Sequence, residues 1–323
     1  MSLKRKYFIL SVIVFFALSS LSACSWWNKD EGPMQSDGYL KMLELQKAKD
    51  AVMNAEIDVA GKIAEPDAAE LERLGDQYVR RSNPNMAFVY YDKSVRMDPT
   101  RSDARYKKAM LLISRGMIPE ASAEFEEIIE NDRTYALAYE GRGRVALIKG
   151  DLDEAQNQFK QAVRINEDLW QAYSFLGIIA DRRQQYKEAV EYYQKAIRIN
   201  PKSSDLFNNL GFSYALDGEY QKALQAYVVA VGLNQKNQKV YGNMGIVLGK
   251  LHRYDEALEA FKKAGDEASA YNNLGCIYLA EEKYVEAIAA FQKAIEVNPK
   301  YYVRARENML RAEAMMKDAG SVN

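Results

Sequence analysis

The chain has 323 residues, of which 28% are charged and 48% hydrophobic, and its formal net charge at pH 7 is −1. This composition is typical of a globular protein and leaves room for one large domain or two ordinary ones. A nearly balanced charge without a basic stripe argues against nucleic-acid binding. With one histidine and two cysteines, the sequence also offers little material for metal or nucleophilic chemistry.

Residues 1–23 have the layout of a secretory signal peptide. A basic cluster, Lys4 to Lys6, precedes an apolar run over residues 7–18, and small residues follow. The apolar run is too short and wrongly flanked for a stable membrane span. We therefore predict that residues 1–23 are removed from the mature protein.

The end of this segment, Leu21-Ser22-Ala23-Cys24, resembles the lipobox of bacterial lipoproteins. In that family the cysteine is diacylated and becomes the mature N-terminus, so the resemblance implies lipidation at Cys24. Ser25 stands where an aspartate would suggest retention in the inner membrane, which implies an outer-membrane lipoprotein facing the periplasm in a Gram-negative cell. Two or three acyl chains, at about 0.8 kcal/mol per buried CH₂, anchor a protein stably. The alternative is an ordinary secretory signal that ends near a cysteine by chance.

Two segments separate this anchor from the rest of the chain. Residues 24–38 are polar, contain glycine and proline, and are predicted to be a flexible tether. Residues 39–66 carry a helical pattern of apolar residues and are predicted to be a helical spacer. The segment Glu65-Pro66-Asp67 ends this pattern, and Asp67 is well placed to cap the helix that follows.

A small residue then recurs every 34 positions. It stands at Gly75, Ala109, Gly143, Gly177, Gly211 and Gly245, whereas the next one, Gly275, follows after only 30 positions. If these residues are position 8 of a repeat unit, position 20 is alanine in every unit and position 24 is always aromatic. The alanines are Ala87, Ala121, Ala155, Ala189, Ala223, Ala257 and Ala287, and the aromatic residues are Tyr91, Phe125, Phe159, Tyr193, Tyr227, Phe261 and Phe291.

Apolar residues at helical spacing on both sides of a polar turn predict that each unit is a pair of antiparallel helices. Small residues at positions 8 and 20 allow the two helices to approach closely. The aromatic residue at position 24 is predicted to fill the space between one pair and the next. An Asp or Asn at position 31, followed by proline in three units, is predicted to end the second helix.

This period and this pattern resemble the tetratricopeptide repeat (TPR). The segments YSFLGIIA, FNNLGFSY and YNNLGCIY match it closely, while RYKKAMLL matches poorly at its first positions. Seven units cover residues 68–301. Residues 302–319 are predicted to be a capping helix with Val303, Met309, Leu310 and Ala314 on a common side. The resemblance implies an all-α fold, a right-handed TPR superhelix (α-solenoid) whose concave groove holds a peptide or a helix of a protein partner.

In that register, positions 2, 5, 6, 9, 12 and 13 face the groove. Asparagine recurs at positions 5 and 6, and Phe212 and Ile246 add apolar area at position 9. Amides can both donate hydrogen bonds to a peptide backbone and accept them from it. The alternative is that asparagine at position 6 merely follows the repeat consensus. The predicted peptide-binding residues are Asn208, Asn209, Phe212, Asn243, Ile246, Asn272 and Asn273.

We expect no enzymatic activity, no cofactor and no metal site. The sequence has no glycine-rich phosphate loop, no pair of Cys or His residues at metal-ligand spacing, and no Ser/His/Asp set with a plausible base. The histidine, His252, falls at a turn position where glycine is usual, and is predicted to be exposed and alone.

Known families of lipid-anchored TPR proteins suggest a role for this chain. The chain resembles the TPR lipoproteins of Tad/Flp pilus assembly, which implies an adaptor for a secretin or another pilus-assembly component. The alternatives are a type IV pilus pilotin, which helps a secretin ring form, and an envelope adaptor for peptidoglycan-remodelling enzymes. Seven units and a helical spacer favour the Tad/Flp resemblance over the pilotins, which are shorter.

The unit that begins the short 30-residue interval, between Gly245 and Gly275, carries residues that are predicted to end one helix and begin the next. Gly265 directly follows Ala264 at position 27, and is predicted to end the helix in a left-handed conformation. Asp266 is placed to cap the next helix, with Ser269 three residues further on. The missing four residues are either a tolerated change in a joint, or a functional change that tightens the groove between Asn243 and Asn273.

Overall fold

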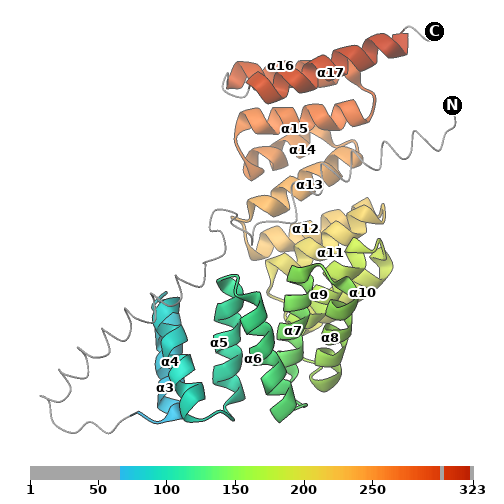
Figure 1. Cartoon of the computed structure of the whole chain (residues 1–323). Coiled ribbons are helices and arrows are strands. Elements are labelled where there is room, and N and C mark those ends of the chain that lie inside the picture. Colours follow the sequence, from blue (N-terminus) through green and yellow to red (C-terminus); the bar gives the residue numbers. More distant parts are fainter. Residues whose placement is uncertain (1–65, 299–301, 321–323) are drawn as a thin grey trace, which may run out of the picture. The chain divides into compact units, whose positions relative to one another are not determined.

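The structure is a computed structural model that describes residues 66–298 and 302–320 (Figure 1). The predicted signal peptide, Cys24, the tether and almost the whole of the predicted spacer lie outside these residues. Within the described ranges every regular element is a helix. None of these helices is long and apolar enough to cross a bilayer.

The helices come in pairs of a first and a second helix. The first helices are α3 (Ala68–Arg80), α5 (Ser102–Ser114), α7 (Ala136–Lys149), α9 (Trp170–Arg182), α11 (Ser204–Leu216), α13 (Gln238–Lys250) and α15 (Glu267–Ala280). The second helices are α4 (Pro84–Met97), α6 (Ile118–Asn131), α8 (Leu152–Ile165), α10 (Tyr186–Ile199), α12 (Tyr220–Leu233), α14 (Tyr254–Ala264) and α16 (Tyr284–Val297). A last helix, α17 (Tyr302–Gly320), follows the seventh pair.

The described residues form two compact units, 66–176 and 177–320, whose boundary falls within α9. Contacts join each helix to the next one along the chain from α3 to α8 and from α10 to α17, so that pairs such as α3–α4 and α11–α12 stack on their neighbours (Figure 1). The predicted fold class, an all-α solenoid of helix pairs with a C-terminal helix, is confirmed.

The glycines at position 8 are explained by aromatic rings. A Cβ atom added at Gly211 would lie 2.7 Å from the ring of Tyr227, and one at Gly245 would lie 2.6 Å from the ring of Phe261. The alanines at position 20 are all completely buried. Each of these rings thus packs on the glycine of its own pair, although Tyr227 also shares an apolar cluster with Val240 of the following pair. The prediction that the aromatic residues fill only the space between pairs was incomplete.

The turn inside each pair uses one left-handed residue, always at the same position of the repeat. Three of these residues are glycines, and the other four are Ser82, Gln184, His252 and Glu282, with φ between 55° and 61°. His252 is exposed, as predicted, but it is not alone, because its Nδ1 lies 2.8 Å from the hydroxyl oxygen of Tyr254.

The missing four residues shorten α14. It has 11 residues, whereas every other second helix has 14. Gly265 after it is extended, with φ −162° and ψ −154°, so the predicted left-handed conformation was wrong. The extended residue leads directly into α15, whose predicted cap is confirmed, because Asp266 Oδ1 accepts a hydrogen bond from Ser269 N at 2.6 Å.

Helix α17 packs on the last pair with a different face from the predicted one. Ala305, Met309 and Ala312 are buried, and Met309 and Ala312 share an apolar cluster with residues of α16. Val303 and Leu310 are exposed. The buried residues are spaced by four and three, which is the spacing of one helical face.

Candidate functional site

The predicted asparagines lie on three first helices of the unit 177–320. Asn208 and Asn209 lie on α11, Asn243 on α13, and Asn272 and Asn273 on α15; together they are called the amide row below. Contacts join α11 to α13, α13 to α15, and α15 to α17. The first helices therefore adjoin one another, and the amide row crosses from helix to helix.

Part of the amide row is used to hold these helices together. Asn243 Nδ2 donates to Asn208 Oδ1 at 2.9 Å, and both residues are buried. Further along, Asn308 Nδ2 on α17 donates to Asn272 Oδ1 at 2.9 Å, and Asn272 is also buried. Such bonds satisfy amides that would otherwise be costly to bury. Asn208, Asn243 and Asn272 thus have a structural role that sequence reasoning missed, and their role in binding stays a prediction.

The row of cross-helix bonds is interrupted at α15. Asn243 occupies position 6 and bonds to position 5 of the preceding unit, Asn208. The equivalent partner of Asn273 would be residue 242, which is glycine. Asn273 is half-buried and forms no side-chain hydrogen bond with the residues that the structure describes. Its amide therefore lacks the partner that its counterpart Asn243 has.

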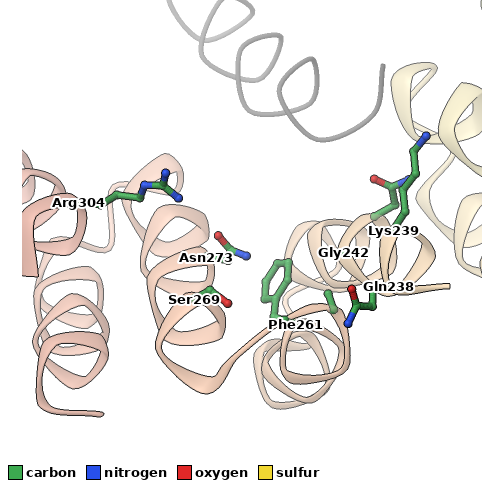
Figure 2. A pocket seen from close by; sticks show the side chains of 10 residues that line it. Gln238, Lys239, Gly242, Phe261, Ser269, Asn273 and Arg304 are labelled. Atoms are coloured by element: carbon green, nitrogen blue, oxygen red, sulfur yellow. The ribbon is translucent and has the colours of Figure 1, made fainter. Parts of the chain in front are cut away.

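A pocket of about 280 Å³ opens at this interruption, and is called the joint pocket below. Asn273 and Ser269 on α15 face Gly242 and Phe261 across it (Figure 2). A Cβ atom added at Gly242 would contact only the Cβ of Ala264, at 3.8 Å, so that no side chain fills this side. The lining residues are Gln238, Lys239, Gly242, Asn243, Phe261, Ala264, Gly265, Ser269, Asn273 and Arg304.

The short α14 and Gly242 together form the joint pocket. Ala264 and Gly265, which line it, are the last residue of the shortened helix and the residue after it. Sequence reasoning noticed the missing turn and the approach of Asn243 and Asn273, but it missed Gly242, Lys239 and Arg304. Comparison of position 5 between units, where Gly242 stands between Asn208 and Asn272, could have revealed the gap.

The other predicted groove residues, Phe212 and Ile246, do not line the joint pocket. Phe212 and Ile246 are half-buried, and Ile246 packs against the apolar cluster of α12–α14. Cys276 is at the surface, with its Sγ 3.7 Å from Asn308 Nδ2. Neighbouring protein atoms reduce the hydration of its thiol and raise its pKa to about 11, which keeps it protonated and weakly nucleophilic at neutral pH.

Between residues 66 and 298, and in α17, no group of three or more His, Cys, Asp or Glu side chains is arranged to hold a metal ion.

Comparison with protein families identifies the repeats. The model of the tetratricopeptide repeat protein 21 C-terminal ARM domain matches residues 46–231, more than half of the chain. Two models described as tetratricopeptide repeat match residues 238–264 and 268–301, and the gap between them is the short joint. The chain belongs to the tetratricopeptide repeat family, which typically provides non-catalytic scaffolds for protein–protein interaction.

Solved structures of the same fold include three with TM-scores above 0.5. The APC/C hetero-tetramer Cut9–Hcn1 has a TM-score of 0.55 at 21% identity; the match covers 76% of this chain and 48% of that one, so this chain spans about half of its length. A tetratricopeptide repeat protein from Parabacteroides merdae has a TM-score of 0.51 at 16% identity, covering 76% and 98% of the two chains. Pseudomonas aeruginosa pilF has a TM-score of 0.52 at 18% identity, covering 66% and 96%. At these identities the likeness concerns the fold alone.

Proposed function

We propose that this protein is a lipid-anchored adaptor of the outer membrane that binds a segment of a protein partner along the amide row. The observation that carries the binding surface is the interrupted row, in which the amide of Asn273 lacks a partner beside an open pocket. The half-buried amide of Asn273 bonds to no other side chain of the described residues, so it is open to a hydrogen bond from a peptide. The half-buried amides of the row, Asn209 and Asn273, can bond backbone groups of any sequence, which suits a scaffold.

The anchor is supported by the order of basic, apolar and small residues before Cys24. If Cys24 carries the lipid, the variant Cys24→Ser should either leave the membrane fraction for the soluble periplasm or retain its leader. Fractionation of cells and detergent partitioning of the processed protein measure this outcome. A Cys24→Ser protein that partitions into detergent like the wild type would exclude lipidation at this residue.

The binding surface is tested with Asn209→Ala and Asn273→Ala combined. Both residues are half-buried, and Asn273 makes no bond that its loss would break, so folding should be retained. Capture of the partner from envelope extract should fall by about tenfold or more, since each lost hydrogen bond contributes roughly 1 kcal/mol and two of them exceed the 1.4 kcal/mol of one decade. The exposed Gln235 serves as a matched amide control in the variant Gln235→Ala. Equal capture by the double variant and by the control would place the partner elsewhere.

The process that we propose for this adaptor is pilus or secretion-system assembly of the Tad/Flp kind. Seven repeat units and the long segment before them support this choice over a pilotin. The identity of the protein captured from envelope extract distinguishes between these roles. Capture of a secretin or another pilus-assembly component supports the proposal. A peptidoglycan-remodelling enzyme that is captured by the wild type and lost with Asn209→Ala and Asn273→Ala would replace it with the alternative role.

A further inference from the structure

We propose that the joint pocket binds the carboxylate of an aspartate or glutamate side chain within the partner segment. This inference rests on the proposed function, in which that segment lies along the amide row, and it names the chemistry of one residue of the partner. The reasons are a missing acceptor, an excess of positive charge and the direction of the amide row on both sides of the pocket.

Residue 242 lacks the side-chain oxygen that accepts a hydrogen bond at the equivalent residues of the neighbouring units. In the two neighbouring positions of the row, a side-chain amide nitrogen donates to a carbonyl oxygen at position 5, from Asn243 to Asn208 and from Asn308 to Asn272. At the third position Asn273 is present, but Gly242 provides no oxygen. A ligand oxygen in the joint pocket would therefore complete the pattern that the fold repeats on both sides.

The charge of the lining residues selects a carboxylate over a neutral carbonyl. Lys239 and Arg304 line the joint pocket, and none of its lining residues is acidic. Lys239 forms no ion pair with the residues that the structure describes. The carboxylate nearest in sequence, Asp266, is occupied as the cap of α15. Charge-assisted hydrogen bonds are roughly twice as strong as neutral ones, so an anionic oxygen satisfies this pocket better than an amide.

The pocket has room for such a side chain. Its volume of about 280 Å³ is far above the roughly 10–15 Å³ that one water molecule needs by the same kind of measure. A carboxylate that enters can keep part of its hydration, which lowers the cost of removing a charge from water.

An internal side chain fits better than a chain terminus. The amide row continues from the joint pocket toward Asn209 on α11 in one direction; in the other direction the bond from Asn308 on α17 to Asn272 extends it. A segment that follows the row therefore extends beyond the pocket on both sides, and its C-terminal carboxylate lies elsewhere.

The test uses small probes and does not need the natural partner. The full chain, labelled with ¹⁵N-glycine, is titrated with N-acetyl-glutamate N-methylamide, N-acetyl-glutamine N-methylamide and N-acetyl-alanine. We expect the glutamate probe to shift the backbone amide resonance of Gly265 saturably, and to bind at least about tenfold more tightly than the other two, which is about 1.4 kcal/mol. Equal or tighter binding of either the glutamine probe or N-acetyl-alanine, or no saturable shift with the glutamate probe, overturns the proposal.

Three variants locate the bound probe. Lys239→Gln should weaken the glutamate probe by about tenfold, whereas Lys236→Gln, which removes the same charge from an exposed residue outside the pocket, should not. Gly242→Asn supplies the missing oxygen from the chain itself, so it should abolish probe binding while raising the melting temperature. Insertion of Arg-Ile-Asn-Pro, the residues at 198–201, after Ala264 should restore the length of α14 and also abolish binding. Wild-type binding by either of these last two variants places the probe outside the joint pocket.

The two proposals fail separately. If the glutamate probe does not bind but envelope capture still depends on Asn209 and Asn273, the adaptor function stands and the acidic residue is wrong. If the glutamate probe binds as expected while capture is unaffected by the double variant, the pocket chemistry is right and the amide row is not the partner's binding surface.

Discussion

Replacement of Gly211 by alanine is expected to lower the free energy of unfolding by about 1–3 kcal/mol, the usual cost of overpacking a buried site. The new Cβ would lie 2.7 Å from the ring of Tyr227, closer than atoms in contact can remain. Tyr227 is itself almost completely buried, so that its ring can move only by displacing the neighbouring pair. The gain in helix propensity from glycine to alanine, at most about 1 kcal/mol, is too small to offset this displacement.

Gly232 provides the matched control, because it lies in α12 of the same pair and a Cβ atom there would meet nothing within 4 Å. Gly232→Ala should therefore raise stability by about 0.5–1 kcal/mol. Urea unfolding followed by circular dichroism measures both variants. A solenoid couples mainly adjacent repeats, so hydrogen exchange should locate the loss in α11, α12 and their neighbours. If the two variants change stability equally, the ring of Tyr227 does not require a glycine at position 211.

Ala109, which stands at position 8 of its unit, does not contradict the expected cost of an alanine at residue 211. In that unit the ring of Phe125 lies against the following pair, where a Cβ added at Gly141 would be only 2.3 Å from the ring. The small residue that accommodates the ring is therefore Gly141 on α7, and Ala109 is tolerated because the close contact has moved to another glycine.

Raising the pH from about 4 to 7 is expected to remove up to about 3 kcal/mol of the stability that depends on Asp181. Ser213 Oγ donates to both carboxylate oxygens of Asp181, at 2.8 and 2.9 Å, and the hydroxyl of Tyr193 donates to one of them at 3.0 Å. Burial nevertheless raises the pKa of this carboxyl from 3.8 to about 6, although both hydrogen bonds act in the opposite direction. A shift of about two units corresponds to roughly 3 kcal/mol.

The sign follows from proton binding. Below pH 3.8 the carboxyl is protonated in both the folded and the unfolded chain. Between that pH and about 6 the unfolded chain releases the proton while the folded chain keeps it, so stability falls as the pH rises. Above pH 6 the full cost of the buried charge is present. The stabilising contribution is thus complete below the unfolded pKa and is lost as the pH rises through the folded one.

Asp181→Asn isolates this contribution from the other titrating groups. The unfolding free energy of the wild type minus that of Asp181→Asn should decrease between pH 4 and pH 7. Asp217→Asn, at an exposed residue after α11, is the matched control for the loss of one carboxyl group. A constant difference for Asp181→Asn would show that this carboxyl titrates in the folded protein as it does in the unfolded chain.

The sequence alone determined the fold class and the residue types at the recurring positions of the repeat. Positions 8, 20 and 24 are read directly from the chain because six of the seven units meet the same steric demand, a ring pressed on the glycine of its own pair beside a buried alanine. The cap at Asp266 was equally accessible, since a side chain that bonds a backbone N–H three residues further on is a local interaction. The conformation of Gly265 was not, because the approach of α15 to α14 decides how the joint is extended.

Only the tertiary structure decided which amides of the predicted surface are free. Asn243 and Asn273 occupy the same position of the repeat and are alike in sequence. One is buried against Asn208, while the other faces Gly242 across an open pocket. The difference depends on residues about 30 positions away that a shortened helix brings alongside, and hydrogen-bond partners across helices follow from that packing rather than from the local pattern. The buried face of α17 was settled in the same way, by the shape of α16 beneath it.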